Sequence, residues 1–112
     1  MGFQITVLSS AWDDLKSLLE FYHKVSGDQV LIDRMADYVV QSIETLQTFP
    51  ERHVVAFYRH ESPVYKMTLS KFPILIYYFI DHRYHTVVVA QIRHAKENPQ
   101  TARRLFGVDE IN

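Results

Sequence analysis

The chain has 112 residues, of which 47% are hydrophobic and 22% are charged. This length and balance are typical of one small soluble domain, and no apolar run approaches the roughly 20 residues that span a bilayer. Cysteine is absent, which excludes disulfides, thiol nucleophiles and thiolate-ligated metals. We therefore expect a single domain over residues 1–112 that resides in the cytoplasm and has no membrane partner.

Charge divides the chain into unlike parts, although its net value is only −1. Residues 1–58 carry four Lys/Arg against eight Asp/Glu, residues 59–104 carry eight against three, and the last eight residues add two acids. The near-neutral total argues against a general nucleic-acid binder. The basic second half is nevertheless a hint about partners.

The first half of the sequence predicts a strand and two helices. Hydrophobic alternation over residues 3–8 indicates a half-buried strand. Ser9 or Ser10 offers an N-cap for a helix whose apolar residues recur at helical spacing up to a Ser-Gly-Asp break. Asp28 can cap a second helix over residues 28–48, which ends before a proline. Two consecutive helices joined by a short polar turn should pack as an antiparallel hairpin.

The second half predicts a sheet. Residues 64–69, 72–80 and 86–92 alternate or are apolar throughout, and the short run 54–58 could be a strand before a polar interruption. A last helical turn would end at Gly107. The order β-α-α-β-β-β predicts an α+β fold, with an N-terminal strand and an antiparallel helical hairpin packed on a mainly antiparallel four-stranded sheet.

Four short motifs follow one another between residues 3 and 99. They are A-x-x-D-L at Ala11, Asp14 and Leu15; L-x-x-F-P at Leu46, Phe49 and Pro50; P-x-x-I-x-Y at Pro73, Ile76 and Tyr78; and a strand-end histidine before Asn-Pro, His94 to Pro99. In this order and spacing they resemble the RelE/ParE superfamily of bacterial toxins, the toxin halves of two-gene toxin–antitoxin modules. The two helices look closer to ParE than to RelE. Many members place an Arg where the third strand begins, for which Arg59 and Lys66 are the nearest candidates here.

The resemblance implies one of two activities. One branch of the superfamily enters the ribosomal A site and cleaves mRNA, whereas the other poisons DNA gyrase. A second helix of about 30 Å and the slightly acidic chain favour the gyrase-directed branch, because affinity for RNA depends on phosphate neutralisation. Both branches imply a cognate antitoxin, and Leu69, Phe72 and the outer side of the helical hairpin are the places where its binding surface would be sought first. A non-toxic degenerate member and an unrelated α+β interaction domain are the further alternatives.

The ribonuclease alternative would place its chemistry where the last strand ends. If that strand ends at Ile92, Arg93 and His94 converge on one rim, with His94 as the acid or base and Arg93 as a cation beside the phosphate. The other expected contacts to nucleic acid or to the target are Lys66, Lys96, Arg103 and Arg104. The pair His82 and His85 offers too few ligands for a metal, and no cofactor is predicted.

Overall fold

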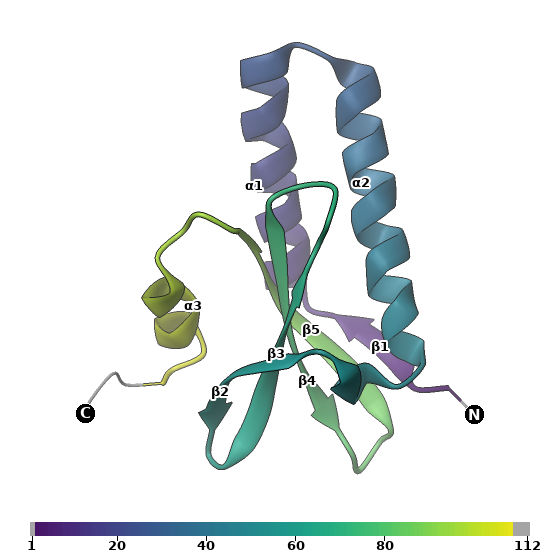
Figure 1. The fold of residues 1–112 in the computed structure, drawn as a ribbon, viewed down its shortest axis with the longest axis vertical. Coiled ribbons are helices and arrows are strands. Elements are labelled where there is room, and N and C mark those ends of the chain that lie inside the picture. The colour runs from purple at the N-terminus through teal and green to yellow at the C-terminus, as the bar shows by residue number, and fades with distance from the viewer. Residues whose placement is uncertain (1, 109–112) are drawn as a thin grey trace.

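The computed structural model describes residues 2–108 and shows a helical hairpin standing on a mixed sheet (Figure 1). Within these residues the sheet has the strand order β1-β5-β4-β3-β2, in which β1 is parallel to β5 and the other neighbours are antiparallel. Its strands are β1 (Gln4–Val7), β2 (Val54–Arg59), β3 (Ser62–Thr68), β4 (Ile74–Asp81) and β5 (Thr86–His94). The helices are α1 (Ser9–Ser26), α2 (Gln29–Glu44) and α3 (Pro99–Leu105), with 3-10 turns η1 (Thr45–Gln47) and η2 (Pro50–Arg52). The predicted α+β fold and mainly antiparallel sheet are confirmed.

The sheet has five strands and not the predicted four. The difference is β2, which pairs with β3 from Val54 to Arg59. The polar segment between them is a tight turn at His60 and Glu61, whose φ angles are 51° and 69°. Both values belong to the turn type that matches the twist of a β-hairpin. The polar residues therefore close a hairpin and do not interrupt the sheet.

The helical hairpin begins differently from the prediction at α1 and as predicted at α2. The N-cap of α1 is Leu8, and Ser10 inside the helix donates its hydroxyl to the carbonyl of Ala90 at 3.3 Å. The serines are therefore not caps, because the preceding strand leads directly into the helix. Asp28 does cap α2, since its carboxylate accepts the N–H groups of Val30 at 3.1 Å and Leu31 at 3.2 Å.

The second helix is shorter than predicted. It ends at Glu44 and is followed by η1, so it spans about 24 Å and not about 30 Å. Arg52 fixes this end, because its guanidinium donates to the carbonyls of Thr45 at 3.3 Å and Thr48 at 2.6 Å. Arg52 thus binds the backbone of the segment that follows α2. The hairpin length therefore gives less support to the gyrase-directed branch than the sequence suggested.

Apolar side chains cover both faces of the sheet. The larger core lies between the sheet and the hairpin and contains Tyr78 and Leu46, whereas the smaller core lies beneath α3 and contains Tyr77 and Phe106. Tyr77 and Tyr78 thus face opposite sides, as neighbours on a central strand must.

A bulge in β5 decides which side its later residues face. The pairing with β4 skips Ala90, and Ala90 joins the core beneath α3. Gln91 also points that way, since it bonds to α3, and Ile92 returns to the hairpin core. By alternation Arg93 then faces the α3 side and His94 the hairpin side.

Full burial along α1 is confined to its first half, and partial burial continues to Tyr22. Ala11 and Leu15 are buried, whereas Phe21 is 55% and Val25 is 70% exposed. In Figure 1 the turn end of the hairpin extends past the sheet, so no strand covers it. Among residues 2–108 no helix combines the length and the hydrophobicity needed to traverse a bilayer.

Candidate functional site

The last strand does not end at Ile92, which corrects the predicted rim. β5 continues to His94, whose partner on β4 is Ile74, and Ile92 is only 1% exposed. Within residues 2–108 the outer edge of β5 has no strand beside it after Val89, and α1 supplies an acceptor there. Asp14 takes the N–H of Ile92 on its carboxylate at 3.0 Å. Pairing with β4 maintains the strand geometry to His94, so Arg93 and His94 point to opposite sides.

Arg93 is the centre of an ion-pair network. Its guanidinium Nη2 lies 2.7 Å from Asp14 Oδ1, and Nη1 lies 3.6 Å from Glu97. Burial raises the pKa of Asp14, while the hydrogen bond from Ile92 and the charge of Arg93 act in the opposite direction. Arg93 thus forms ion pairs with two acids of its own chain.

Gln91 links this network to α3. The side chain is 5% exposed, accepts Arg93 Nε on Oε1 at 3.1 Å and donates Nε2 to the carbonyl of Ala102 at 3.1 Å. Both ends of a buried amide are therefore satisfied, as burial requires. One chain of contacts from Asp14 through Arg93 and Gln91 to Ala102 joins α1, β5 and α3.

His94 is bound through both ring nitrogens. Its Nε2 lies 2.7 Å from Tyr22 Oη, and its Nδ1 accepts the backbone N–H of Lys96 at 3.0 Å. The two rings are also stacked, with centroids 6.0 Å apart. Because Nδ1 is an acceptor, the neutral imidazole carries its proton on Nε2 and donates it to Tyr22. His94 therefore joins α1 to the end of β5.

A cleft of about 430 Å³ opens between the start of α1, β5 and α3. Two arginines line it, Arg93 and Arg59, together with two acids, Asp13 and Asp14. The guanidinium of Arg59 lies 4.8 Å from the ring centroid of Phe79 and 5.5 Å from that of Phe106. Ring faces attract such a cation and hold it in place. The cleft is therefore lined by charges of both signs.

The predicted site residues do not form one cluster. Lys66 is half-buried on β3 and pairs with Tyr77, on the same side of the sheet as Arg93 but two strands away. The other predicted contacts are Lys96, exposed after β5; Arg103, half-buried on α3 with its guanidinium 5.3 Å from the ring centroid of Phe57; and Arg104, exposed on α3. His94 lies on the hairpin side.

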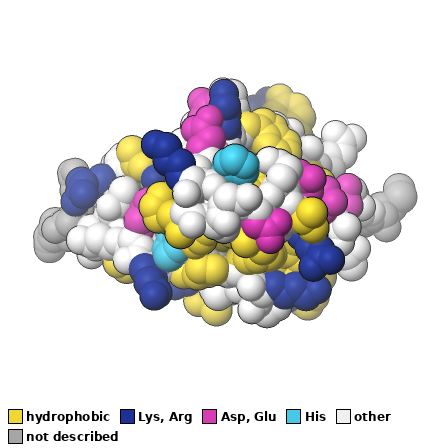
Figure 2. Space-filling model, turned by 90° about the horizontal axis from the view of Figure 1, so that it is seen from above, with side chains coloured by type: hydrophobic (Ala, Val, Ile, Leu, Met, Phe, Trp, Pro, Cys, Tyr) yellow, Lys and Arg dark blue, Asp and Glu magenta, His cyan; other side chains and the backbone are white. Residues whose placement is uncertain are grey.

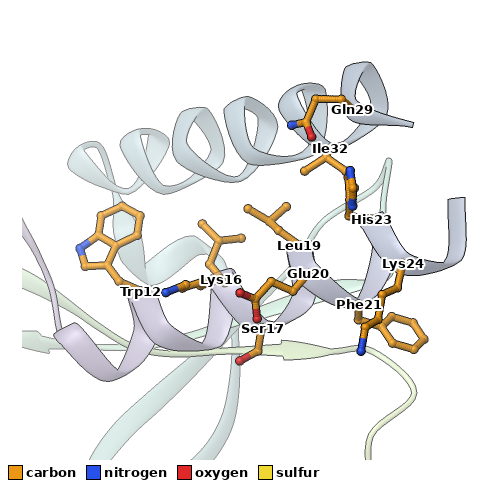
Figure 3. A pocket seen from close by; sticks show the side chains of 11 residues that line it. Trp12, Lys16, Ser17, Leu19, Glu20, Phe21, His23, Lys24, Gln29 and Ile32 are labelled. Atoms are coloured by element: carbon orange, nitrogen blue, oxygen red, sulfur yellow. The ribbon is translucent and has the colours of Figure 1, made fainter. Parts of the chain in front are cut away.

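A larger groove of about 850 Å³ runs along α1 and the beginning of α2 (Figure 3). Its apolar lining is Trp12, Leu15, Leu19, Phe21 and Ile32, and its charged lining is Lys16, Glu20 and Lys24. Trp12 is 44% exposed although it is the largest apolar side chain of the helix. An exposed apolar groove with a charged border is typical of a surface that binds another chain.

The places suggested for the antitoxin differ in exposure. Leu69 is only 6% exposed and belongs to the hairpin core, so its side chain offers a partner little surface. Phe72 is half-buried with its ring centroid 5.7 Å from that of Tyr38. The helical hairpin carries the groove along α1 and the beginning of α2.

One histidine of the pair near the β4–β5 turn stacks on an aromatic ring. The ring of His85 stacks on Phe3 with centroids 3.8 Å apart. In the part of the chain that the structure describes, His, Asp and Glu side chains form no group of three that could hold a metal ion.

Comparison with known proteins places the chain in a family. A family model described as the ParE toxin of the type II toxin–antitoxin system parDE matches residues 5–99. The chain belongs to the ParE toxin family. The predicted membership in the RelE/ParE superfamily, on the ParE side, is thus confirmed. A search of curated proteins finds no match.

Solved structures share the fold of this ParE-family toxin at low sequence identity. A chain of the chromosomal ParDE system from P. aeruginosa has a TM-score of 0.71 at 14% identity, over 84% of this chain and 97% of that one. A chain of the RelBE2 complex from Mycobacterium tuberculosis gives 0.59 at 18%, over 84% and 99%. A mutant of the E. coli toxin RelE in the free state gives 0.59 at 12%, over 97% and 100%. These values show a common architecture.

Several residues that organise the site of this ParE-family toxin were not predicted to do so. Asp14 was seen only as part of a helix motif, and Arg59 only as a possible third-strand arginine. Nothing in the sequence indicates that Gln91 and Tyr22 bind Arg93 and His94, because a single amide or phenol within an apolar run resembles any half-buried residue. Trp12 could have been identified from the sequence, because it widens the apolar face of α1 beyond the residues needed to pack against the core.

Proposed function

We propose that this toxin acts as an inhibitor of DNA gyrase and is neutralised by a cognate antitoxin. The observation that carries the proposal is the match of the ParE family model to residues 5–99, which includes the helical hairpin and nearly the whole sheet. Gyrase inhibition is the activity that the resemblance to ParE implies. It requires a protein surface and no acid–base chemistry by the toxin.

The contacts of His94 and Arg93 support an activity without such chemistry. A general acid or base must exchange a proton with its substrate, and a phosphate clamp needs a cation that can turn toward the phosphate. Both ring nitrogens of His94 are hydrogen-bonded within the chain, and Arg93 is paired with Asp14 and Glu97. Ribonuclease chemistry would first have to break these contacts.

The distribution of charge supports a protein target over RNA. The net charge is −1, and Figure 2, which looks down on the hairpin end, shows basic and acidic side chains interspersed with hydrophobic ones. Contact with RNA backbones gains most of its affinity from a concentrated basic surface. Protein interfaces, in contrast, are mixed and contain exposed apolar anchors.

The groove on α1 is the surface where we expect the antitoxin. It is mostly apolar, is open along the helix, and has charges of both signs at its border (Figure 3). An amphipathic segment can lay its apolar face into such a groove and pair its polar face with the rim. Trp12 and Phe21 are the exposed side chains that this segment would cover.

A supercoiling assay tests the proposal. The purified chain is added to DNA gyrase, ATP and relaxed plasmid, and the products are resolved before and after protease treatment. We expect lost supercoiling and protein-linked linear DNA, both reversed by the co-expressed antitoxin, with His94→Ala as active as the wild type. Full supercoiling, with circular dichroism showing that the added chain is folded, would contradict the proposal.

A ribosome-dependent ribonuclease is the second candidate, because one cleft contains both Arg59 and Arg93. Two guanidinium groups on one surface can hold a phosphate between them. Cleavage of mRNA on programmed ribosomes, lost in Arg93→Ala and His94→Ala, would favour this candidate over gyrase inhibition. A folded chain inactive in both assays would instead favour a non-toxic member of the family.

A further inference from the structure

Phe49 has an unusual backbone conformation and an unusual exposure. It lies between η1 and η2 with φ 49° and ψ 58°, in the left-handed region, and its side chain is 66% exposed. Side chains other than glycine, asparagine and aspartate rarely adopt this region. A turn alone would favour glycine here, and a core role would bury the ring. Neither explains an exposed phenylalanine.

The surrounding structure holds Phe49 in place from two sides. Arg52 Nη1 donates to the carbonyl of Phe49 at 3.1 Å, in addition to its bonds at the end of α2. Tyr78, in the hairpin core, donates its hydroxyl to the carbonyl of Pro50 at 2.6 Å. Leu46 and Pro50 on either side are fully buried. These contacts fix the backbone of the turn while the phenyl ring stays exposed.

We propose that Phe49 is the anchor side chain by which this toxin engages DNA gyrase, an inference that rests on the function proposed above. Aromatic anchors in well-packed pockets supply a large share of the binding energy of protein interfaces. A ring on a rigid turn loses little conformational freedom on binding. An unfavourable backbone conformation that is fixed from inside is typical of a functional position.

The neighbours of Phe49 indicate the chemistry of the pocket that receives it. In the sequence around Phe49, Val54 just after η2 is 67% exposed, and Glu44 and Glu51 are exposed acids. The guanidinium of Arg52 is bound to backbone carbonyls. Phosphate groups would be repelled here, so the surface fits an apolar protein pocket with a basic rim. This surface follows the end of α2, whereas the groove involves α1 and the beginning of α2.

The test compares three variants with the wild type. Phe49→Ala and Phe49→Gly remove the ring, and glycine also suits the left-handed turn. Tyr84→Ala removes an aromatic side chain that is 67% exposed in the β4–β5 turn and serves as the matched control. For each chain we would measure affinity for gyrase holoenzyme, inhibition of supercoiling, affinity for the antitoxin, self-association and Tm.

We expect both Phe49 variants to lose at least about tenfold in gyrase affinity and to inhibit supercoiling correspondingly less. Antitoxin affinity should be unchanged, Tyr84→Ala should match the wild type, and the Tm of Phe49→Gly should equal or exceed the wild-type value. If Phe49→Ala does not fold, Phe49→Gly decides the question.

Four results would overturn the inference. Gyrase affinity unchanged in both Phe49 variants, with an inhibitory wild type, would reject the anchor and leave the proposed function intact. A loss confined to antitoxin binding would make the antitoxin the occupant, and a loss of self-association would make it a second copy of the chain. A folded wild type that does not inhibit gyrase would reject the proposed function and the anchor together.

Discussion

Asp14 and Arg93 are separated by 79 positions in the sequence, yet Asp14 Oδ1 lies 2.7 Å from Arg93 Nη2. The other carboxylate oxygen accepts the N–H of Ile92, on the stretch of β5 that no strand covers. One side chain from α1 therefore supplies a backbone acceptor for the sheet and a counter-ion for its last arginine. It couples the hairpin to the end of β5.

Replacing Asp14 by Ala should destabilise the protein. The substitution leaves the Ile92 N–H without its acceptor and the half-buried guanidinium of Arg93 without its nearest acid. An unsatisfied buried donor costs about 1–3 kcal/mol, so the free energy of unfolding should fall by about that amount in a urea titration. Asp13→Ala is the matched control, since Asp13 is the exposed neighbour. Equal stability of the two variants would show that the Asp14 contacts contribute nothing.

The architecture was predictable because it depends on local patterns. Alternation, helical spacing and the Asp28 cap each depend on residues close in sequence, and they were sufficient for the fold class, the first strand, the two helices and the last three strands. They did not establish β2 as a fifth strand of the sheet. The misplaced boundaries depend on distant partners. β5 continues past Ile92 because Leu75 and Ile74 of β4 pair with Arg93 and His94, and Asp14 of α1 binds the N–H of Ile92 on the other edge. Spacing along the chain carries no information about such contacts.

The candidate site was less predictable for the same reason. The sequence identified Arg93 and His94 as chemically capable residues but not the groups that bind them, which come from α1. The bulge at Ala90 also changes the face of every later residue in β5, and periodicity cannot anticipate one inserted residue. Arg93 and His94, which were predicted to form a reactive rim, instead bind Asp14 and Tyr22 and join β5 to α1.

His53 should make stability depend on pH. Burial lowers the pKa of its imidazole from the ordinary value of 6.5, and the charge of Arg52 adds to the effect. The folded state therefore binds the proton less tightly than the unfolded state, so this stability is present above pH 6.5 and declines as the pH falls through and below it. Unfolding free energies measured from pH 7.5 to 5 should decline less in His53→Gln than in the wild type. Parallel curves would show that His53 is not the group responsible.

The neutral imidazole of His94 should be the Nε2–H tautomer, and this side chain should be dispensable for inhibition. Its Nδ1 accepts from Lys96 and its Nε2 faces Tyr22, which leaves a single arrangement for the neutral ring. Long-range nitrogen–proton NMR spectra at pH 7.5 should show the protonated nitrogen to be Nε2, and Tyr22→Phe should shift that signal. His94→Ala should lose about 0.5–1.5 kcal/mol of stability and keep its gyrase inhibition per folded molecule. A proton on Nδ1 would contradict the assigned hydrogen bonds. If a folded His94→Ala chain lost its toxic activity, His94 would be a functional residue, and ribonuclease chemistry would be favoured.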